Sequence, residues 1–285
     1  MKTFLKQCRW GQFLLIEGDM ISGYVNKLGH WSDIELDLFR ILLPHQTGVC
    51  IEVGANIGMH TVPLAQLCSR GQVISYEPQR PIYHVMCANV ALNNCLNVCT
   101  RRAAVGAGAG RIEIQSSDYE TPWNYGSFSI SKGFDQEGDY AGPVTCEMVD
   151  IVSLDEDPAL DHLTTVNLLK IDAEGHEVDV IRGAEKLIAR HRPDIFVEPG
   201  SAENADILRN ILAAHGYSGF WFVGSRFRPD DEIRPEPGST HFDVNLVFRP
   251  SEAMPLNLPP LIGSEDLPKG IPVLSSFGES VAGAE

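Results

Sequence analysis

Short apolar runs alternate with segments of helical periodicity from residue 49 onward. Residues 49–53 and 73–76 are runs of the kind that form buried strands, while residues 60–68 repeat apolar side chains at helical spacing. A second helix is expected at residues 81–93, where Pro81 suits the first helical turn. Strands that alternate with helices in this way predict a parallel sheet covered by helices on both faces.

The same alternation continues in the C-terminal half. After a third strand at residues 98–105 we expect two more strands, at residues 165–171 and 194–197. Two helices are expected at residues 177–191 and 203–215. A closing antiparallel pair of strands is expected at residues 218–223 and 242–248. Residues 106–148 interrupt the alternation and predict an inserted hairpin and a long loop. Loops of this length inside a compact domain are often functional, or else disordered.

The two ends of the chain depart from this pattern. Residues 1–30 are expected to form short strands and a turn that pack on the core, with residues 20–25 extended. Residues 31–249 then form the main domain. Residues 250–285 carry many Pro, Gly and Ser residues with little periodicity, so we expect a tail that is ordered only in part.

A helix is expected to begin at Ser32. Ser32 and Glu35, three positions apart, form the capping-box pattern, in which two side chains bond the free amides of the first turn. Trp31 and Glu35 are also candidates to cover an acceptor site, but the capping box explains them without a function.

Composition and charge narrow the classes of partner. A formal net charge of −16 disfavours nucleic acid and anionic membranes, because their phosphates would be repelled. Seven cysteines, an odd number without a CxxC pair, are typical of reduced thiols in a cytoplasmic protein. The first residues do not resemble a signal peptide, and no apolar run reaches the roughly 18 residues of a membrane span.

The strand at residues 49–53 leads directly into a glycine turn, Gly54-Ala55-Asn56-Ile57-Gly58. Ligands of open α/β sheets bind at the carboxyl ends of the strands, and glycines let the backbone approach them closely. Glu77 ends the next strand, where an acidic residue can accept hydrogen bonds from ribose hydroxyls. Together these features indicate a nucleoside-containing ligand.

The turn favours S-adenosylmethionine over a dinucleotide. A dinucleotide fingerprint, GxGxxG, would place glycines where this chain has Asn56 and Met59. Glu52, two positions before the first glycine, would repel a pyrophosphate but suits a methionine amino group or a sulfonium. An NAD-linked oxidoreductase is therefore kept only as an alternative.

Three motifs carry a family resemblance: Ile51-Glu52-Val53-Gly54-Ala55-Asn56-Ile57-Gly58, Tyr76-Glu77-Pro78 and Leu169-Lys170-Ile171-Asp172-Ala173-Glu174-Gly175-His176-Glu177. From about Glu35 to Phe248 their order and spacing resemble the FkbM-type S-adenosylmethionine-dependent methyltransferases. The Lys-Ile-Asp-x-Glu-Gly segment is the most specific part. Glu52 stands where many relatives carry Asp, a conservative change that should keep the cofactor.

The resemblance implies a class I (Rossmann-like) α/β methyltransferase fold, with a seven-stranded, mostly parallel sheet, a final antiparallel strand and helices on both faces. It implies S-adenosylmethionine as methyl donor and S-adenosylhomocysteine as product. The implied acceptor is a hydroxyl of a sugar, a glycan or a natural-product-like small molecule. N-methylation and a non-catalytic binding protein on the same fold stay open as alternatives.

The cofactor is expected along the glycine turn and the neighbouring strand ends. Glu52 would bind the methionine part or only cap the turn, and Asn56 would orient the methionine carboxylate or only stabilise the turn. Adenine is expected near Ala104, with Asp118 contacting its amino group. The complete expected set is Glu52, Gly54, Asn56, Gly58, Glu77, Ala104, Asp118 and Asp172.

Asp172, Glu174 and His176 are the catalytic candidates, because they follow a strand end beside the expected methyl position. They would orient the acceptor or accept its proton, or else serve as turn and N-cap residues. Asp172 and Glu198, at adjacent strand ends, are candidates for holding Mg²⁺ with waters.

Other side chains have a structural interpretation beside the functional one. Lys170 is expected as a strand residue that reaches toward an acid, and His60 as a structural residue. His241 is a candidate wall of the site. Four aromatic residues of the long loop would face a carbohydrate, form a satellite core or make a homodimer contact: Tyr119, Trp123, Tyr125 and Phe128.

Overall fold

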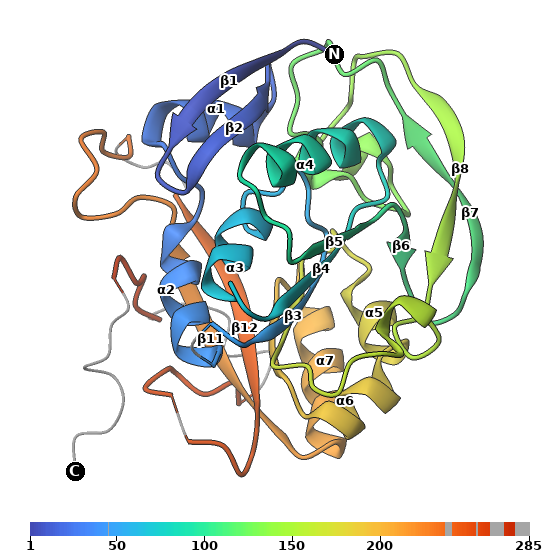
Figure 1. The fold of residues 1–285 in the computed structure, drawn as a ribbon, viewed down its shortest axis with the longest axis vertical. Helices are drawn as coiled ribbons and strands as arrows, with labels where there is room; N and C mark the ends of the chain where they lie inside the picture. Colours follow the sequence, from blue (N-terminus) through green and yellow to red (C-terminus); the bar gives the residue numbers. More distant parts are fainter. Residues whose placement is uncertain (45, 237–240, 255, 263–270, 277–285) are drawn as a thin grey trace.

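A seven-stranded sheet forms the centre of the computed structural model, which describes residues 1–44, 46–236, 241–254, 256–262 and 271–276 (Figure 1). Its strands lie in the order β11-β12-β10-β9-β3-β4-β5. Their bounds, in that order, are Tyr217–Ser225, Phe242–Pro250, Asp194–Val197, Leu168–Ile171, Val49–Val53, Gln72–Tyr76 and Val98–Arg101. β12 runs antiparallel to both neighbours and the other pairings are parallel, which confirms the predicted fold class.

Helices cover both faces of this sheet (Figure 1). Residues of α2, α3 and α4 join one apolar core, and residues of α5, α6 and α7 join the other. Their bounds are Asp33–Leu42, Thr61–Leu67, Arg80–Leu92, Glu177–Arg182, Glu185–His191 and Ala202–Ala214. Successive strand residues point to opposite faces, so in β3 Cys50 belongs to the first core and Ile51 to the second. Glu52 therefore lies on the α2–α3 side.

The N-terminal segment contains a helix that the sequence interpretation missed. β1 (Thr3–Cys8) and β2 (Gly11–Ile16) pair as a hairpin, but α1 (Met20–Leu28) follows in place of the extended segment expected at residues 20–25. Asp19 caps α1 by accepting a hydrogen bond from the Ser22 backbone N–H at 2.8 Å. An Asp cap of this kind outweighs the weak alternation of the apolar residues.

The predicted capping box is not formed, although α2 begins where it was expected. Ser32 is in the left-handed region (φ 42°) and its hydroxyl donates to Asp243 Oδ2 at 2.9 Å. Glu35 turns away from the helix end and accepts a hydrogen bond from Asn245 Nδ2 at 3.2 Å. Contacts to β12 have replaced the local cap.

Two predicted elements are each divided. The strand expected at 98–105 becomes β5 and β6 (Ala104–Val105), and β6 joins a second sheet in the order β6-β8-β7. The helix expected at 177–191 breaks at Gly183, where a Cβ would lie 2.0 Å from the Gly106 carbonyl oxygen. The backbone just after β6 thus packs against the break in the helix.

The insertion after β6 is a pair of antiparallel strands joined by a long loop. β7 (Gly110–Ser116) pairs with β8 (Thr145–Val152), and short 3₁₀ turns lie at η1 (Tyr125–Ser127), η2 (Phe134–Gln136) and, beyond β8, η3 (Pro158–Leu160). Most of the loop aromatics pack around Phe134, whose ring contacts those of Tyr119, Tyr125, Phe128 and Tyr140, and this group joins the first apolar core. Of the four residues considered for the acceptor, Phe128 alone lines the cavity described below.

The tail pairs with the edge strand β11 at two places. Trp221 N–H donates to Pro259 and Leu261 N–H to Gly219, while Leu274 N–H donates to Val223 and Ser225 N–H to Leu274, all at 2.8 Å. Of the tail expected at 250–285, residues 255, 263–270 and 277–285 lie outside the described residues. No helix within the described ranges is long and apolar enough to cross a membrane.

Candidate functional site

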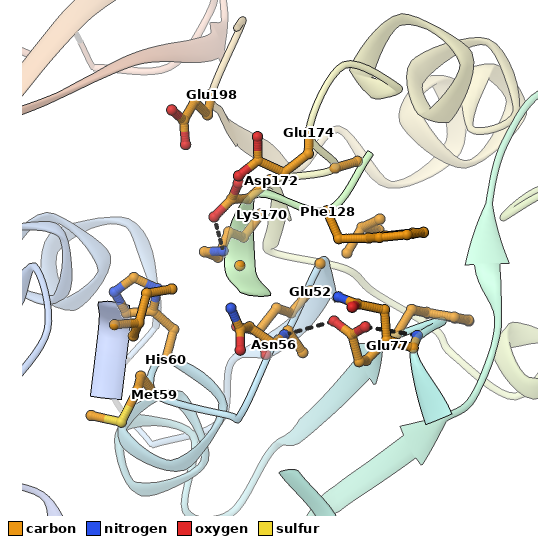
Figure 2. Close-up of a pocket in the computed structure, with 18 of the residues that line it drawn as sticks. Glu52, Asn56, Met59, His60, Glu77, Phe128, Lys170, Asp172, Glu174 and Glu198 are labelled. Atoms are coloured by element: carbon orange, nitrogen blue, oxygen red, sulfur yellow. Dashed lines mark hydrogen bonds and ion pairs between the residues drawn. The ribbon is translucent and has the colours of Figure 1, made fainter. Parts of the chain in front are cut away.

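A cavity opens at the carboxyl ends of β3, β4, β9 and β10 (Figure 2). This is the edge at which open α/β sheets bind ligands. Its walls come from the glycine turn, the strand ends, α1, α2, the inserted loop and β12. It contains most of the predicted site residues, namely Glu52, Gly54, Asn56, Glu77, Ala104, Asp172, Glu174 and Glu198.

The glycine turn is locked to the segment after β9. Gly54 has φ +77°, and a Cβ there would lie 1.7 Å from the carbonyl oxygen of Asp172. Asn56 also has positive φ (49°), and its side-chain oxygen accepts a hydrogen bond from the Ile57 N–H at 2.6 Å. Asn56 therefore stabilises the turn and also lines the cavity. Gly58 (φ +85°) shapes the turn but lies outside the cavity wall.

Glu52 is fully buried at the floor of the cavity. Its Oε2 accepts hydrogen bonds from Thr61 Oγ1 at 2.6 Å and Ser75 Oγ at 2.8 Å. Its Oε1 has no partner among the described residues. Burial raises the pKa of Glu52 above its usual range, while Lys170 and the two hydroxyls oppose the rise. A buried carboxylate oxygen without a partner is costly alone and suits a ligand that donates a hydrogen bond.

Glu77, which directly follows β4, forms hydrogen bonds that connect the end of this strand to the glycine turn. Its Oε2 accepts from the Asn56 backbone N–H at 3.0 Å and its Oε1 from the Gln79 N–H at 2.9 Å (Figure 2). Burial raises its pKa to about 7 despite these bonds. Each oxygen keeps a second lone pair, so the carboxylate can still receive two hydroxyl donors from a ribose.

The wall beyond Glu77 is apolar. Ala104 and Val105 lie there with Phe128 and Ile130 from the insertion, a combination that suits a flat aromatic base. Asp118 is not part of this wall, which corrects the expected adenine contact: it is exposed and its Oδ1 accepts from the Glu120 N–H at 3.0 Å. The local turn, with Tyr119 buried, points Asp118 to solvent.

The opposite half of the cavity is rich in carboxylates: Glu35, Glu137, Asp172, Glu174, Glu198 and Asp243. Asp172 lies 3.5 Å from Lys170 Nζ, and Asp243 pairs with Arg226 at 2.5 Å. Burial and the nearby Asp172 carboxylate raise the pKa of Glu174 to about 9. Burial and four surrounding carboxylates, led by Asp172, raise the pKa of Glu198 well above its usual range.

His176 does not reach the cavity, in contrast to the expectation of a catalytic base. It is the N-cap position of α5, and its Nδ1 lies 3.7 Å from Asp179. Its neighbour Glu177 supports the loop instead by accepting hydrogen bonds from the Ala173 and Gly175 N–H groups at 3.2 and 2.9 Å. The helix start explains both residues structurally.

Lys170 and His60 line the cavity, although the sequence interpretation treated both as structural. Lys170 is only 2% exposed; burial alone lowers its pKa, but the carboxylates of Asp172, Glu52 and Glu35 outweigh it and raise the pKa. The position of Lys170 could have indicated this, because Lys170 pairs with Glu52 in the strand register and so points to the same face of the sheet. His60 likewise follows the glycine turn directly.

The described residues do not provide a metal site. No group of three or more His, Cys, Asp or Glu side chains in this part of the chain is arranged to hold an ion. Asp172 and Glu198 both face the cavity, but the donor set expected for Mg²⁺ is not assembled around them.

Comparison with known proteins agrees with this geometry. Residues 52–218 match the family described as "Methyltransferase FkbM domain". "Methyltransferase 1" of Beauveria bassiana is 27% identical over 143 residues, 47% of this chain and 57% of that protein. The AMB antimetabolite synthetase AmbE of Pseudomonas aeruginosa is 24% identical over 213 residues, 62% of this chain and 10% of that protein. The chain thus spans little more than half of one curated relative and a tenth of the other.

Among solved structures, methyltransferase FkbM from Methylobacillus flagellatus KT superposes with a TM-score of 0.48 at 16% identity, over 79% of this chain and 49% of that one. The family match covers more than half of the 285 residues. It includes the glycine turn, Glu52 and Glu77, and the strand-end carboxylates Asp172, Glu174 and Glu198. The chain belongs to the FkbM methyltransferase domain family.

Proposed function

We propose that this protein is an S-adenosylmethionine-dependent methyltransferase that methylates a hydroxyl of a small molecule, either a sugar, a glycan unit or a natural-product-like compound. The observation that carries the proposal is a single cavity with two halves: the first contains the glycine turn, Glu52 and Glu77, and the second is rich in carboxylates at the strand ends. Family membership supports the same reaction class.

The residues of the first half fit S-adenosylmethionine part by part. The unpartnered Oε1 of Glu52 suits the cationic methionine end, Glu77 suits the ribose hydroxyls, and the apolar wall at Ala104 and Phe128 suits adenine. When bound, this cofactor supplies an activated methyl group on a sulfonium. The acidic floor would repel a pyrophosphate, which disfavours the dinucleotide alternative.

The residues of the second half would position the acceptor and take its proton. Methyl transfer is an in-line displacement that depends mostly on orientation, with a base to receive the hydroxyl proton. We assign that base to Asp172, which faces the cavity with Lys170 beside it. Glu174, with a raised pKa, is instead suited to hold the acceptor by hydrogen bonds.

Isothermal titration with S-adenosylmethionine and S-adenosylhomocysteine tests the cofactor assignment. Saturable binding is expected for both, and no heat at millimolar ligand would contradict it. Radiolabelled S-adenosylmethionine with a panel of sugars and metabolites then tests transfer. Label attached to nitrogen would replace hydroxyl transfer by N-methylation, and Asp172→Asn is expected to lower turnover with cofactor affinity kept.

A further inference from the structure

The acceptor half of the cavity has more acids than cations. Its carboxylates are Glu35, Glu137, Asp172, Glu174, Glu198 and Asp243. Glu137 is exposed and accepts a hydrogen bond from Asn124, and the two cations, Lys170 and Arg226, are paired with Asp172 and Asp243. Glu35, Glu174 and Glu198 have no Lys or Arg within 4.0 Å anywhere in the described ranges. Glu174 and Glu198 point into one shared space (Figure 2), and Glu35 lines the same cavity, so no cation is in place to balance these three carboxyl groups when they ionise.

A second observation points to an absent donor. His60 is 6% exposed and lines the cavity, and its Nε2 has no hydrogen-bond partner among the described residues. Its other ring nitrogen bonds the Trp31 backbone. Burial and the positive charge of Lys170 keep the imidazole neutral by lowering its pKa. Nε2 is thus a lone-pair acceptor, 3.6 Å from Glu35 Oε2, and no donor from the described part of the chain bonds to it.

Crowding by neighbouring carboxylates raises the pKa of Glu174 and Glu198, so these two acids hold their protons while the cavity is free. Once ionised, they present only hydrogen-bond acceptors, as does His60 Nε2. A neutral polyol can donate one hydrogen bond per hydroxyl but supplies no charge that would favour the ionised carboxylates. A protonated amine donates up to three hydrogen bonds and also supplies the positive charge that lets these carboxylates ionise. A divalent ion would need its ligands gathered around one point, which the described residues do not do.

We propose that the acceptor carries a protonated amine, which Glu174 and Glu198 bind, while Glu35 and His60 Nε2 accept hydrogen bonds from its neighbouring polar groups. This inference rests on the proposed methyltransferase function and specifies its substrate class: amino sugars, amino alcohols or similar hydroxylated amines. The ammonium group anchors the acceptor from the strand-end side. The acceptor's hydroxyl then lies toward Asp172.

The test is calorimetric titration of the full chain with glucosamine, galactosamine and 2-aminoethanol, each beside its N-acetyl derivative. Each titration is run with and without saturating S-adenosylhomocysteine. At least one amine is expected to bind at least tenfold more tightly than its uncharged derivative. Equal affinity within every pair, or no binding by any amine, would overturn the inference.

Glu174→Gln and Glu198→Gln are each expected to weaken amine binding at least tenfold, with S-adenosylhomocysteine affinity retained as the check of folding. Glu203→Gln, which removes an exposed acid on α7, is the control of equal net charge and should leave amine binding unchanged. Amine affinity that survives both cavity variants also overturns the inference. Failure of the nucleoside to bind would instead count against the methyltransferase proposal.

Discussion

Lys170 shows how a single buried charge organises this site. It lies between carboxylates of both cavity halves, Glu52 on the floor and Asp172 and Glu35 on the acceptor side. At 2% exposure it has almost no water to solvate it. A buried cation is stable in such a place only because its partners are there, and the partners depend equally on it.

Replacing Lys170 by Met should therefore destabilise the protein by about 3–5 kcal/mol at neutral pH, since the acids around it lose their counter-charge. The loss should shrink at about pH 5.5, because burial raises the pKa of Glu35 and Glu52, and their protonation removes uncompensated charge. Urea unfolding at both pH values measures this. An equal loss at both would show that the role of Lys170 is packing alone.

Glu77 gives the cofactor side a predicted pH dependence. Its pKa is about 7 in the free protein, and ribose hydroxyls would donate to its ionised form. Affinity for S-adenosylhomocysteine should therefore fall as the pH drops below 7, approaching about tenfold per pH unit. Titration calorimetry between about pH 6 and pH 8 follows it. Glu77→Gln should bind more weakly and show a flat profile; an unchanged affinity would remove Glu77 from the site.

Residue type and strand position were enough to predict Glu52, Glu77, Asp172 and Glu174 as cavity residues. They were not enough for His60, because its significance depends on an unpartnered nitrogen that only the three-dimensional packing reveals. The predictions that Asp118 and His176 belong to the site were wrong, because local backbone turns direct both side chains away from the cavity.

At the scale of elements, strong apolar periodicity was enough to predict helices and strands, whereas breaks that arise from backbone packing could not be predicted from the sequence. The central strands and α7 follow their apolar patterns closely. The break at Gly183 was invisible because it arises from contact with Gly106, far away in sequence. The helix α1 was missed because its start depends on one cap at Asp19 more than on periodicity.

One buried side chain links three of these elements. Asn89 on α4 is fully buried; it accepts from the Leu14 N–H of β2 at 2.6 Å and donates to the Leu14 and Ile57 carbonyls at 3.1 and 2.8 Å. It therefore joins the N-terminal hairpin to the glycine turn. Since Ile57 belongs to that turn, disturbance of the hairpin contact should reach the cofactor side.

Asn89→Ala should cost about 2–4 kcal/mol, because it leaves buried backbone groups without partners. It should also weaken S-adenosylhomocysteine binding. Asn93→Ala is the matched control: Asn93 makes the same two-way contact with Gln12 but is partly exposed, so water can replace it. Thermal unfolding and calorimetry of both variants measure this, and equal losses would refute the distinction.

For the whole molecule, the acidic acceptor half makes stability depend on pH. Glu174 has a folded pKa of about 9, against about 4.3 for an unfolded glutamate. Between these values the folded state holds a proton that the unfolded chain releases. Stability contributed by this group therefore falls as pH rises, by at most about 1.4 kcal/mol per pH unit.

The ligand-free protein should accordingly unfold more easily at about pH 8 than at about pH 7, as measured by urea denaturation. Glu174→Gln should flatten this slope and raise stability at the higher pH. Glu203→Gln, the exposed control, should keep the wild-type slope. A Glu174→Gln profile that still follows the wild type would assign the pH dependence to other groups.

The contact between Gly54 and the Asp172 carbonyl has a consequence for redesign of this protein. Any side chain at position 54 must push apart two backbone segments, one belonging to the glycine turn and the other bearing Asp172, the proposed proton acceptor. The two halves of the cavity are consequently held in a fixed position relative to each other by this contact. Libraries that aim to accept altered methyl donors should keep this contact and vary the adenine wall at Phe128 and Ile130, which belong to the insertion and take no part in the contact.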